Sequence, residues 1–221
     1  MKTVNSRQWT VNSVLYLALF ALSGWLASCG GGGGRYCWAQ SLSSSIAQSP
    51  GPSVPWSPPS GAYYAPEANL EALDAAALGS AQQSIWLAAF SLSDKAVIYA
   101  LADRAAHGVA VWIYLDRGEL QAECRGDASC ARSPLHLLLN VQNVQIRVKR
   151  SKVLMHLKAY LVDAALERDG SANFSEQGEM RQDNSAVFSE DPHQTTLFIR
   201  KFKAIWQRPD NLTVAQAVGS P

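Results

Sequence analysis

The sequence predicts an α/β domain in which a mixed central β-sheet is flanked by helices. Short apolar stretches of strand length alternate with amphipathic stretches of helical period, the order expected of a sheet layered with helices. Apolar residues make up 48% of the 221 residues and charged residues 17%, which suits one domain with a substantial core and an appended terminal segment.

The first half of the predicted domain contains a β-α-β unit. In chain order it comprises a strand at 62–65, a helix with Leu70, Leu73 and Ala77 on one face, a strand at 84–92, a helix from Val97 to Ala105 and a strand at 109–115. The second helix has apolar residues at helical spacing and ends at Gly108, a residue type common at helix C-termini. Residues 109–115 are uniformly apolar, which is typical of a fully buried strand.

The second half adds further strands and a C-terminal helix. After a polar segment at 117–133 come a short helix at 134–139, strands at 144–148, 155–162 and 184–188, and a helix with Phe198, Phe202, Ile205 and Trp206 on one face. The two-residue period of the 155–162 strand places His156 and Lys158 on the same face. We expect the domain to span 61–208 and residues 209–221 to form a frayed tail.

The most informative residues follow a fixed spacing. They form the pattern HxKx4Dx6GSxN, with His156, Lys158, Asp163, Gly170, Ser171 and Asn173 at its fixed positions. Six such positions arise by chance on the order of once in several hundred thousand chains. The pattern resembles the signature of the phospholipase D superfamily, whose members cleave phosphodiester bonds with a histidine nucleophile. The resemblance covers about residues 63–206 and implies a phospholipase D-like fold and a hydrolase activity.

The resemblance gives the signature residues expected roles. His156 is the expected catalytic nucleophile, because a neutral imidazole that attacks phosphorus forms a phosphohistidine and divides the displacement into two easier steps. Lys158 is expected as a second catalytic residue that binds a non-bridging phosphate oxygen through its ammonium group. Asn173 and Ser171 can donate hydrogen bonds to the phosphate, and Gly170 permits close backbone approach.

Two aspartates receive different expected roles. In relatives an acidic residue shortly after the signature, often Glu, accepts a hydrogen bond from the other ring nitrogen of the histidine, and Asp183 is the best match here. Asp183 is therefore expected as a third catalytic residue, whereas Asp163 is expected to be structural. The sequence shows no cluster of carboxylates or histidines that suggests a metal, and the family chemistry requires neither a metal nor another cofactor.

A single signature provides only half of the expected site. A phosphohistidine mechanism needs a second, protonated imidazole for the leaving group, and the sequence contains no internal repeat. In single-motif members of the superfamily two subunits bring their signatures together across a two-fold axis. The resemblance therefore implies a homodimer with a shared active site, in which the two copies of His156 have coupled pKa values.

The substrate has three interpretations. A nuclease that cleaves DNA or RNA is the first, because compact single-motif members resemble nucleases and Arg147, Lys149, Arg150 and Lys152 precede the signature. That stretch could equally be a solvated charged surface. Hydrolysis of phospholipid headgroups, that is lipid degradation, is favoured by a membrane tether and a nearly neutral body. A non-catalytic dimer that binds anions is the third interpretation, which the intact signature disfavours.

The N-terminus has the layout of a bacterial export signal. Lys2 and Arg7 precede an apolar run, and Leu26-Ala27-Ser28-Cys29 resembles the lipobox of lipoproteins, with Cys29 as the lipidated residue. Residues 1–29 are thus a predicted signal peptide and 30–60 a flexible tether rich in Gly, Ser and Pro. Ordinary cleavage or an uncleaved signal anchor are the alternatives. Each places the domain outside the cytoplasm, on the periplasmic side of the cell envelope.

Export also governs how the cysteines are interpreted. Oxidising compartments favour disulfides, and Cys124 and Cys130 lie close together within the polar segment. We expect them to close a local loop through a disulfide, with two free thiols as the next alternative. A structural zinc site is third, because His136 and Cys37 are too scattered to complete it.

Overall fold

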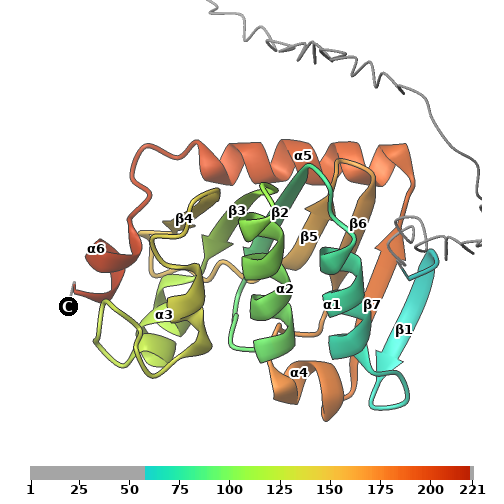
Figure 1. The fold of residues 1–221 in the computed structure, drawn as a ribbon, viewed down its shortest axis with the longest axis horizontal. Helices are drawn as coiled ribbons and strands as arrows, with labels where there is room; N and C mark the ends of the chain where they lie inside the picture. The colour runs from blue at the N-terminus through green and yellow to red at the C-terminus, as the bar shows by residue number, and fades with distance from the viewer. Residues whose placement is uncertain (1–57, 220–221) are drawn as a thin grey trace, which may run out of the picture. The chain divides into compact units, whose positions relative to one another are not determined.

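Seven strands form one mixed sheet in the order β1-β7-β6-β5-β2-β3-β4 (Figure 1). The structure, a computed structural model, describes residues 58–219. The strands are β1 (Gly61–Ala65), β2 (Ser84–Ala89), β3 (Ala110–Leu115), β4 (Val144–Val148), β5 (Lys158–Val162), β6 (Leu166–Gly170) and β7 (Asn184–Ser189). The neighbours β2, β3 and β4 run parallel, and every other adjacent pair is antiparallel. The predicted α/β class and mixed sheet are therefore confirmed.

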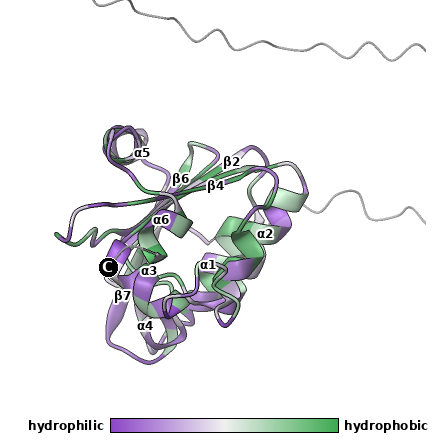
Figure 2. Cartoon of the chain, turned by 90° about the vertical axis from the view of Figure 1, so that its left-hand side faces the viewer, coloured by the Kyte–Doolittle hydropathy of each residue, from purple (hydrophilic) through white to green (hydrophobic). Residues whose placement is uncertain are grey.

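Helices cover the two faces of the sheet unequally. They are α1 (Leu70–Gly79), α2 (Lys95–Ala106), α3 (Arg117–Cys124), the 3₁₀ helix η1 (Pro134–Leu138), α4 (Glu176–Met180), α5 (Pro192–Trp206) and α6 (Val214–Val218). Figure 2 shows α1, α2 and α3 on one side of the sheet and α5 on the other. The predicted β-α-β unit is β2, α2 and β3, whose two strands pair in parallel.

The alternation of side chains along the strands produces two cores. In β2, Ile85 and Leu87 point into the larger core under α1 and α2, whereas Ala88 faces α5. In β5, Tyr160 joins the larger core and Leu161 the smaller one. The sheet is thus buried on both sides at its centre, where the signature strand β5 lies.

The segments between the predicted elements contain more structure than expected. The polar segment at 117–133 begins with the helix α3, which Asp116 caps by accepting hydrogen bonds from the amides of Gly118 and Glu119. The strand β6 and the helix α4 also form where none was expected. β5 begins at Lys158, so His156 precedes the strand and the expected strand at 155–162 was too long.

The expectation of a frayed tail at 209–221 is also wrong, because Leu212 and the residues of α6 belong to the folded domain. The backbone of Leu212 pairs with Val148 of β4, and α6 follows with a capping box at Thr213. Leu212 and Ala217 are buried in the larger core. The chain therefore remains part of the folded domain beyond Arg208, because these apolar side chains cover the edge of the sheet at β4.

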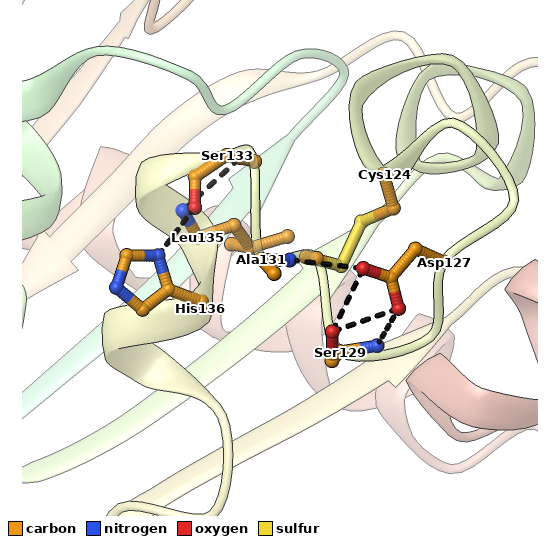
Figure 3. Close-up of a disulfide and its surroundings, with 8 residues drawn as sticks. Cys124, Asp127, Ser129, Ala131, Ser133, Leu135 and His136 are labelled. Atoms are coloured by element: carbon orange, nitrogen blue, oxygen red, sulfur yellow. Dashed lines mark hydrogen bonds between the residues drawn. A yellow bond between two sulfur atoms is a disulfide. The ribbon is translucent and has the colours of Figure 1, made fainter.

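A disulfide closes the turn after α3. Cys124 is bonded to Cys130, the pairing expected from the sequence, and both residues are buried (Figure 3). Inside this turn the carboxylate of Asp127 accepts hydrogen bonds from Ser129 and from the amide of Ala131. The bond thus ties the end of α3 to the segment that leads into η1.

The predictions for the N-terminus lie outside the described residues. They include the signal peptide at 1–29, the lipidated Cys29 and almost all of the tether at 30–60. Between residues 58 and 219, none of the helices has both the length and the apolar character that a membrane span requires.

Candidate active site

His156 lies in the segment that precedes β5, and its side chain is exposed. Hydrogen bonds hold the backbone of the residues on both sides of it. The amide of Met155 donates to Asp116 Oδ2 at 2.8 Å, and the carbonyl of Leu157 accepts from the amide of Phe90 at 2.8 Å. The His156 ring packs on the Phe90 ring with centroids 4.5 Å apart. The imidazole is thus exposed to solvent while its backbone is fixed at the ends of β2 and β3.

Lys158 begins β5 and is only 4% exposed. Its ammonium donates to the carbonyl of His156 at 2.8 Å and lies 4.6 Å from the centre of the Phe90 ring. Burial lowers the pKa of Lys158 and the charge of Arg168 lowers it further, whereas Glu119 and Asp116 oppose the shift. The structure therefore places a partly desolvated cation directly beside the candidate nucleophile.

The Gly-Ser turn that follows β6 is packed against β7. A Cβ on Gly170 would lie 2.2 Å from the carbonyl oxygen of Ser185, so glycine is required for the approach of two strands rather than of a ligand. The hydroxyl of Ser171 donates to Asn184 Oδ1 and accepts from the amide of Ser185, both at 2.9 Å. To donate to a phosphate as expected, the Ser171 hydroxyl would have to break its hydrogen bond to Asn184 Oδ1.

Asn173 is held by the short helix α4. A Cβ on Gly178 would lie 2.5 Å from the carbonyl oxygen of Asn173, so this helix approaches the signature backbone very closely. The Oδ1 atom of Asn173 is buried and has no hydrogen-bond partner among the described residues. The next residue, Phe174, accepts at its carbonyl from the amides of Ser93 and Asp94. The loop after β2 therefore contacts both the His-x-Lys and the Gly-Ser-x-Asn parts of the signature.

The two aspartates differ sharply in their surroundings. Asp163 accepts hydrogen bonds at 2.8 Å from the amides of Gln82, Gln83 and Ser84, which fixes the start of β2 and is a structural arrangement. Asp183 is exposed and lines a cavity of about 350 Å³ beside Ser171. The described structure contains no hydrogen bond between Asp183 and His156, which lines a different cavity, so the orienting contact expected from the sequence is not formed within this chain.

Basic side chains surround His156, although not all of those expected. The cavity at His156, about 270 Å³, is lined by Lys149 together with Lys201 and Arg208, which the sequence analysis did not single out. Arg147 instead lies over the Trp206 ring, 4.6 Å from its centre, and packs against the end of α5. In the part of the chain that the structure describes, no group of three or more His, Cys, Asp or Glu side chains could hold a metal ion.

Four buried polar residues behind the signature were missed by the sequence analysis. They are Asp74 of α1, Tyr160 of β5, Arg168 of β6 and Glu179 of α4. Two of them carry a weak signal: Asp74 lies on the apolar face of its helix, and Arg168 follows Leu166 at strand period. Nothing in the sequence around Glu179 indicates burial.

The chain was compared with protein families and with individual proteins. Residues 75–206 match a family model described as "Cardiolipin synthase, PLD-like domain". A phospholipase D of Rickettsia bellii is 29% identical over 127 residues, 57% of this chain and 58% of the relative. A phospholipase D of Rickettsia conorii is 28% identical over 141 residues, 63% of this chain and 65% of the relative. Each match thus spans less than two thirds of the relative.

Solved structures with the same fold include two bacterial proteins. NucT from Helicobacter pylori superposes with a TM-score of 0.58 at 17% identity, covering 67% of this chain and 96% of that protein. Nuc from Salmonella typhimurium, a phospholipase D family member, gives a TM-score of 0.57 at 22% identity, with coverages of 70% and 97%. At these identities the similarity establishes the shared fold.

Proposed function

Because the chain belongs to the phospholipase D superfamily, we propose that it is a phosphodiesterase whose reaction depends on His156 and Lys158. The observation that supports this most strongly is that an exposed imidazole and a buried ammonium both lie against the Phe90 ring. The imidazole is accessible to a phosphate. The ammonium is held in a poorly solvated position, where its interaction with a developing negative charge is strong.

The proposed reaction has two displacements. A neutral His156 attacks phosphorus, a P–N bond forms, and the P–O bond to the leaving alcohol breaks while that oxygen receives a proton from a second imidazole. Water then attacks the phosphohistidine, gives its proton to the second imidazole and releases the first. Lys158 stabilises the charge on the non-bridging oxygens in both steps.

The second imidazole is proposed to come from another copy of the chain. His156 is the only histidine that lines the described cavity at the site. A two-fold axis close to this cavity would place the exposed His156 of each subunit opposite the other. The proposed enzyme is therefore a homodimer with one composite active site, and neither subunit is complete without its partner.

Nucleic acid is the proposed substrate. The cavity at His156 contains Lys149, Lys201 and Arg208, so the approach to the site is basic although the whole chain is nearly neutral. A polyanion gains from such a surface through release of its counterions. The similarity to the Rickettsia phospholipases D supports hydrolysis of phospholipids as the second candidate.

A substrate panel tests the proposal. Purified full-length protein should be incubated with single-stranded DNA, with RNA and with phospholipid vesicles, each with and without a chelator. We expect cleavage of a nucleic acid that persists in chelator and disappears in His156→Ala. Cleavage of lipid alone would overturn the proposed substrate, and loss of all turnover in chelator would overturn the metal-independent mechanism.

A further inference from the structure

Arg168 forms the centre of a buried polar network behind the signature. Its side chain is fully buried and is paired with Asp74 through two contacts, Nη2 to Oδ2 at 2.8 Å and Nε to Oδ1 at 3.2 Å. The hydroxyl of Tyr160 donates to the same carboxylate at 2.9 Å. The guanidinium also lies over the Phe174 ring, 4.6 Å from its centre. These contacts fix its orientation.

The remaining nitrogen of Arg168 joins the two halves of the signature. Its Nη1 donates to the carbonyl of Lys158 at 2.7 Å and to the carbonyl of Ala172 at 3.2 Å. Lys158 belongs to the His-x-Lys half and Ala172 lies within the Gly-Ser-x-Asn half. A single donor group thus contacts the backbone on both sides of the candidate site.

This bridge replaces a missing part of the sheet. The pairing of β5 with β6 extends from Val162↔Leu166 to Tyr160↔Arg168 and then ends. On the other side of β6, the pairing with β7 continues as far as Gly170↔Ala186. The β5–β6 ladder therefore ends before the site, and Arg168 Nη1 donates to the carbonyls of Lys158 and Ala172 beyond its last pair.

The charges of the network are compatible with this role. Burial, followed by the neighbouring carboxylates Asp74 and Asp94, raises the pKa of Glu179 to about 10, so this side chain is protonated at neutral pH. Burial raises the pKa of Asp74 as well, but the adjacent Arg168 guanidinium opposes that shift and pairs with the carboxylate. Tyr160, whose pKa burial also raises, remains a neutral donor. Within this network, Arg168 and Asp74 are therefore a cation and an anion in direct contact.

We propose that Arg168 is a positioning residue of the active site, which sets the separation between Lys158 and the Gly-Ser-x-Asn turn. The inference rests on the proposed phosphodiesterase function, since positioning has meaning only for a reacting site. A buried ion pair by itself contributes little net stability compared with apolar residues of similar volume. What an apolar residue at 168 could not provide is the donor shared by the two carbonyls.

The decisive variant removes the ion pair without leaving a buried charge. Asp74→Asn combined with Arg168→Met eliminates both charges together and so avoids the large cost of an unpaired buried charge. If Arg168 positions the site, this double variant should fold, lose about 100-fold in kcat and keep KM within about threefold of the wild type. A folded double variant with wild-type kcat would overturn the proposal.

Arg168→Lys provides the second variant. It retains the charge beside Asp74 but cannot donate to Asp74 and to both carbonyls in the same planar geometry. We expect a similar loss in kcat, whereas Arg181→Lys, on the exposed end of α4, should match the wild type. Full activity in Arg168→Lys would contradict the role of the shared donor.

A measurement independent of turnover separates this inference from the proposed function. The carbonyl ¹³C resonances of Lys158 and Ala172 report their hydrogen bonds directly. Both should shift in Arg168→Lys and stay unchanged in Arg181→Lys. If the wild type cleaves no phosphodiester while these shifts occur, the function fails and the bridge stands. If neither resonance shifts, the bridge itself is refuted whatever the activity.

Discussion

The Phe90 ring lies against the His156 ring, 4.5 Å between centroids, and also carries the Lys158 ammonium 4.6 Å from its centre. One aromatic side chain from the loop after β2 thus orients both candidate catalytic groups. Its backbone amide adds a hydrogen bond to the carbonyl of Leu157, the residue between them. Phe90 therefore contacts the candidate nucleophile, the cation and the backbone between them.

Replacing Phe90 should impair the reaction more than the fold. We expect Phe90→Leu to lower kcat about 10-fold, because a smaller branched side chain leaves the His156 ring without the aromatic ring it packs against. Steady-state kinetics and thermal denaturation measure the two effects. Phe188→Leu, in the buried part of β7, is the control that should lower stability and spare kcat. Equal kcat values for Phe90→Leu and the wild type would refute the assigned role.

The close approach of α4 predicts an asymmetry between two glycines. Gly178→Ala should destabilise the protein by about 1–3 kcal/mol, because the added methyl group meets the backbone of Asn173. Gly79→Ala, at the end of α1, meets nothing within 4 Å and should be neutral or stabilise by up to about 1 kcal/mol. Urea denaturation measures both. A Gly178→Ala variant with the free energy of unfolding of the wild type would show that α4 is not fixed against Asn173.

Glu179 should make stability depend on pH in a defined direction. Its pKa in the folded state, raised to about 10, lies above the ordinary value of 4.5. The stability it contributes is therefore fully present below about pH 4.5 and is lost as the pH rises towards 10, because the unfolded chain releases the proton first. Glu179→Gln abolishes this loss.

Urea denaturation at pH 5 and pH 9 measures the effect. The free energy of unfolding of Glu179→Gln minus that of the wild type should be larger at pH 9 than at pH 5 by at least about 1 kcal/mol. Glu176→Gln, on the exposed side of α4, is the matched control without this trend. An identical stability difference at both pH values would mean that Glu179 is ionised in the folded protein.

The shared site predicts that activity depends on assembly. Mixing wild-type chains with an excess of chains that carry His156→Ala produces heterodimers with one histidine at the composite site, and the turnover of the wild-type chains should fall as these form. Dilution of the wild type should lower its specific activity in parallel with dissociation, followed by light scattering. A fully active monomer would exclude the shared site.

Long periodic segments made most of the fold predictable from the sequence. The strands and helix between Ser84 and Leu115 show clear periods, and α5 carries its apolar residues on one face. β6 was missed because Leu166–Gly170 contains charged residues, one of which, Arg168, is buried. α3 and α4 were missed because they are short and polar, and they depend on caps and on tertiary contacts.

The candidate site was predictable only where a motif marked it. The spacing from His156 to Asn173 identified the signature, but Phe90 and Arg168 act through contacts between distant segments, which no local pattern records. Asp183 was selected by its position after the signature, and the structure places it beside Ser171 instead of His156. Position along the chain did not determine which way this side chain faces.

The most direct test of the central claim is the capture of the covalent intermediate on His156. End-labelled substrate is mixed with enzyme and quenched in alkali, in which a phosphoramidate survives, and the labelled peptide is identified by mass spectrometry. We predict an adduct on His156 that forms and decays within one turnover and is absent in His156→Ala. Turnover by His156→Ala at the wild-type rate, or an adduct on another residue, would contradict the mechanism.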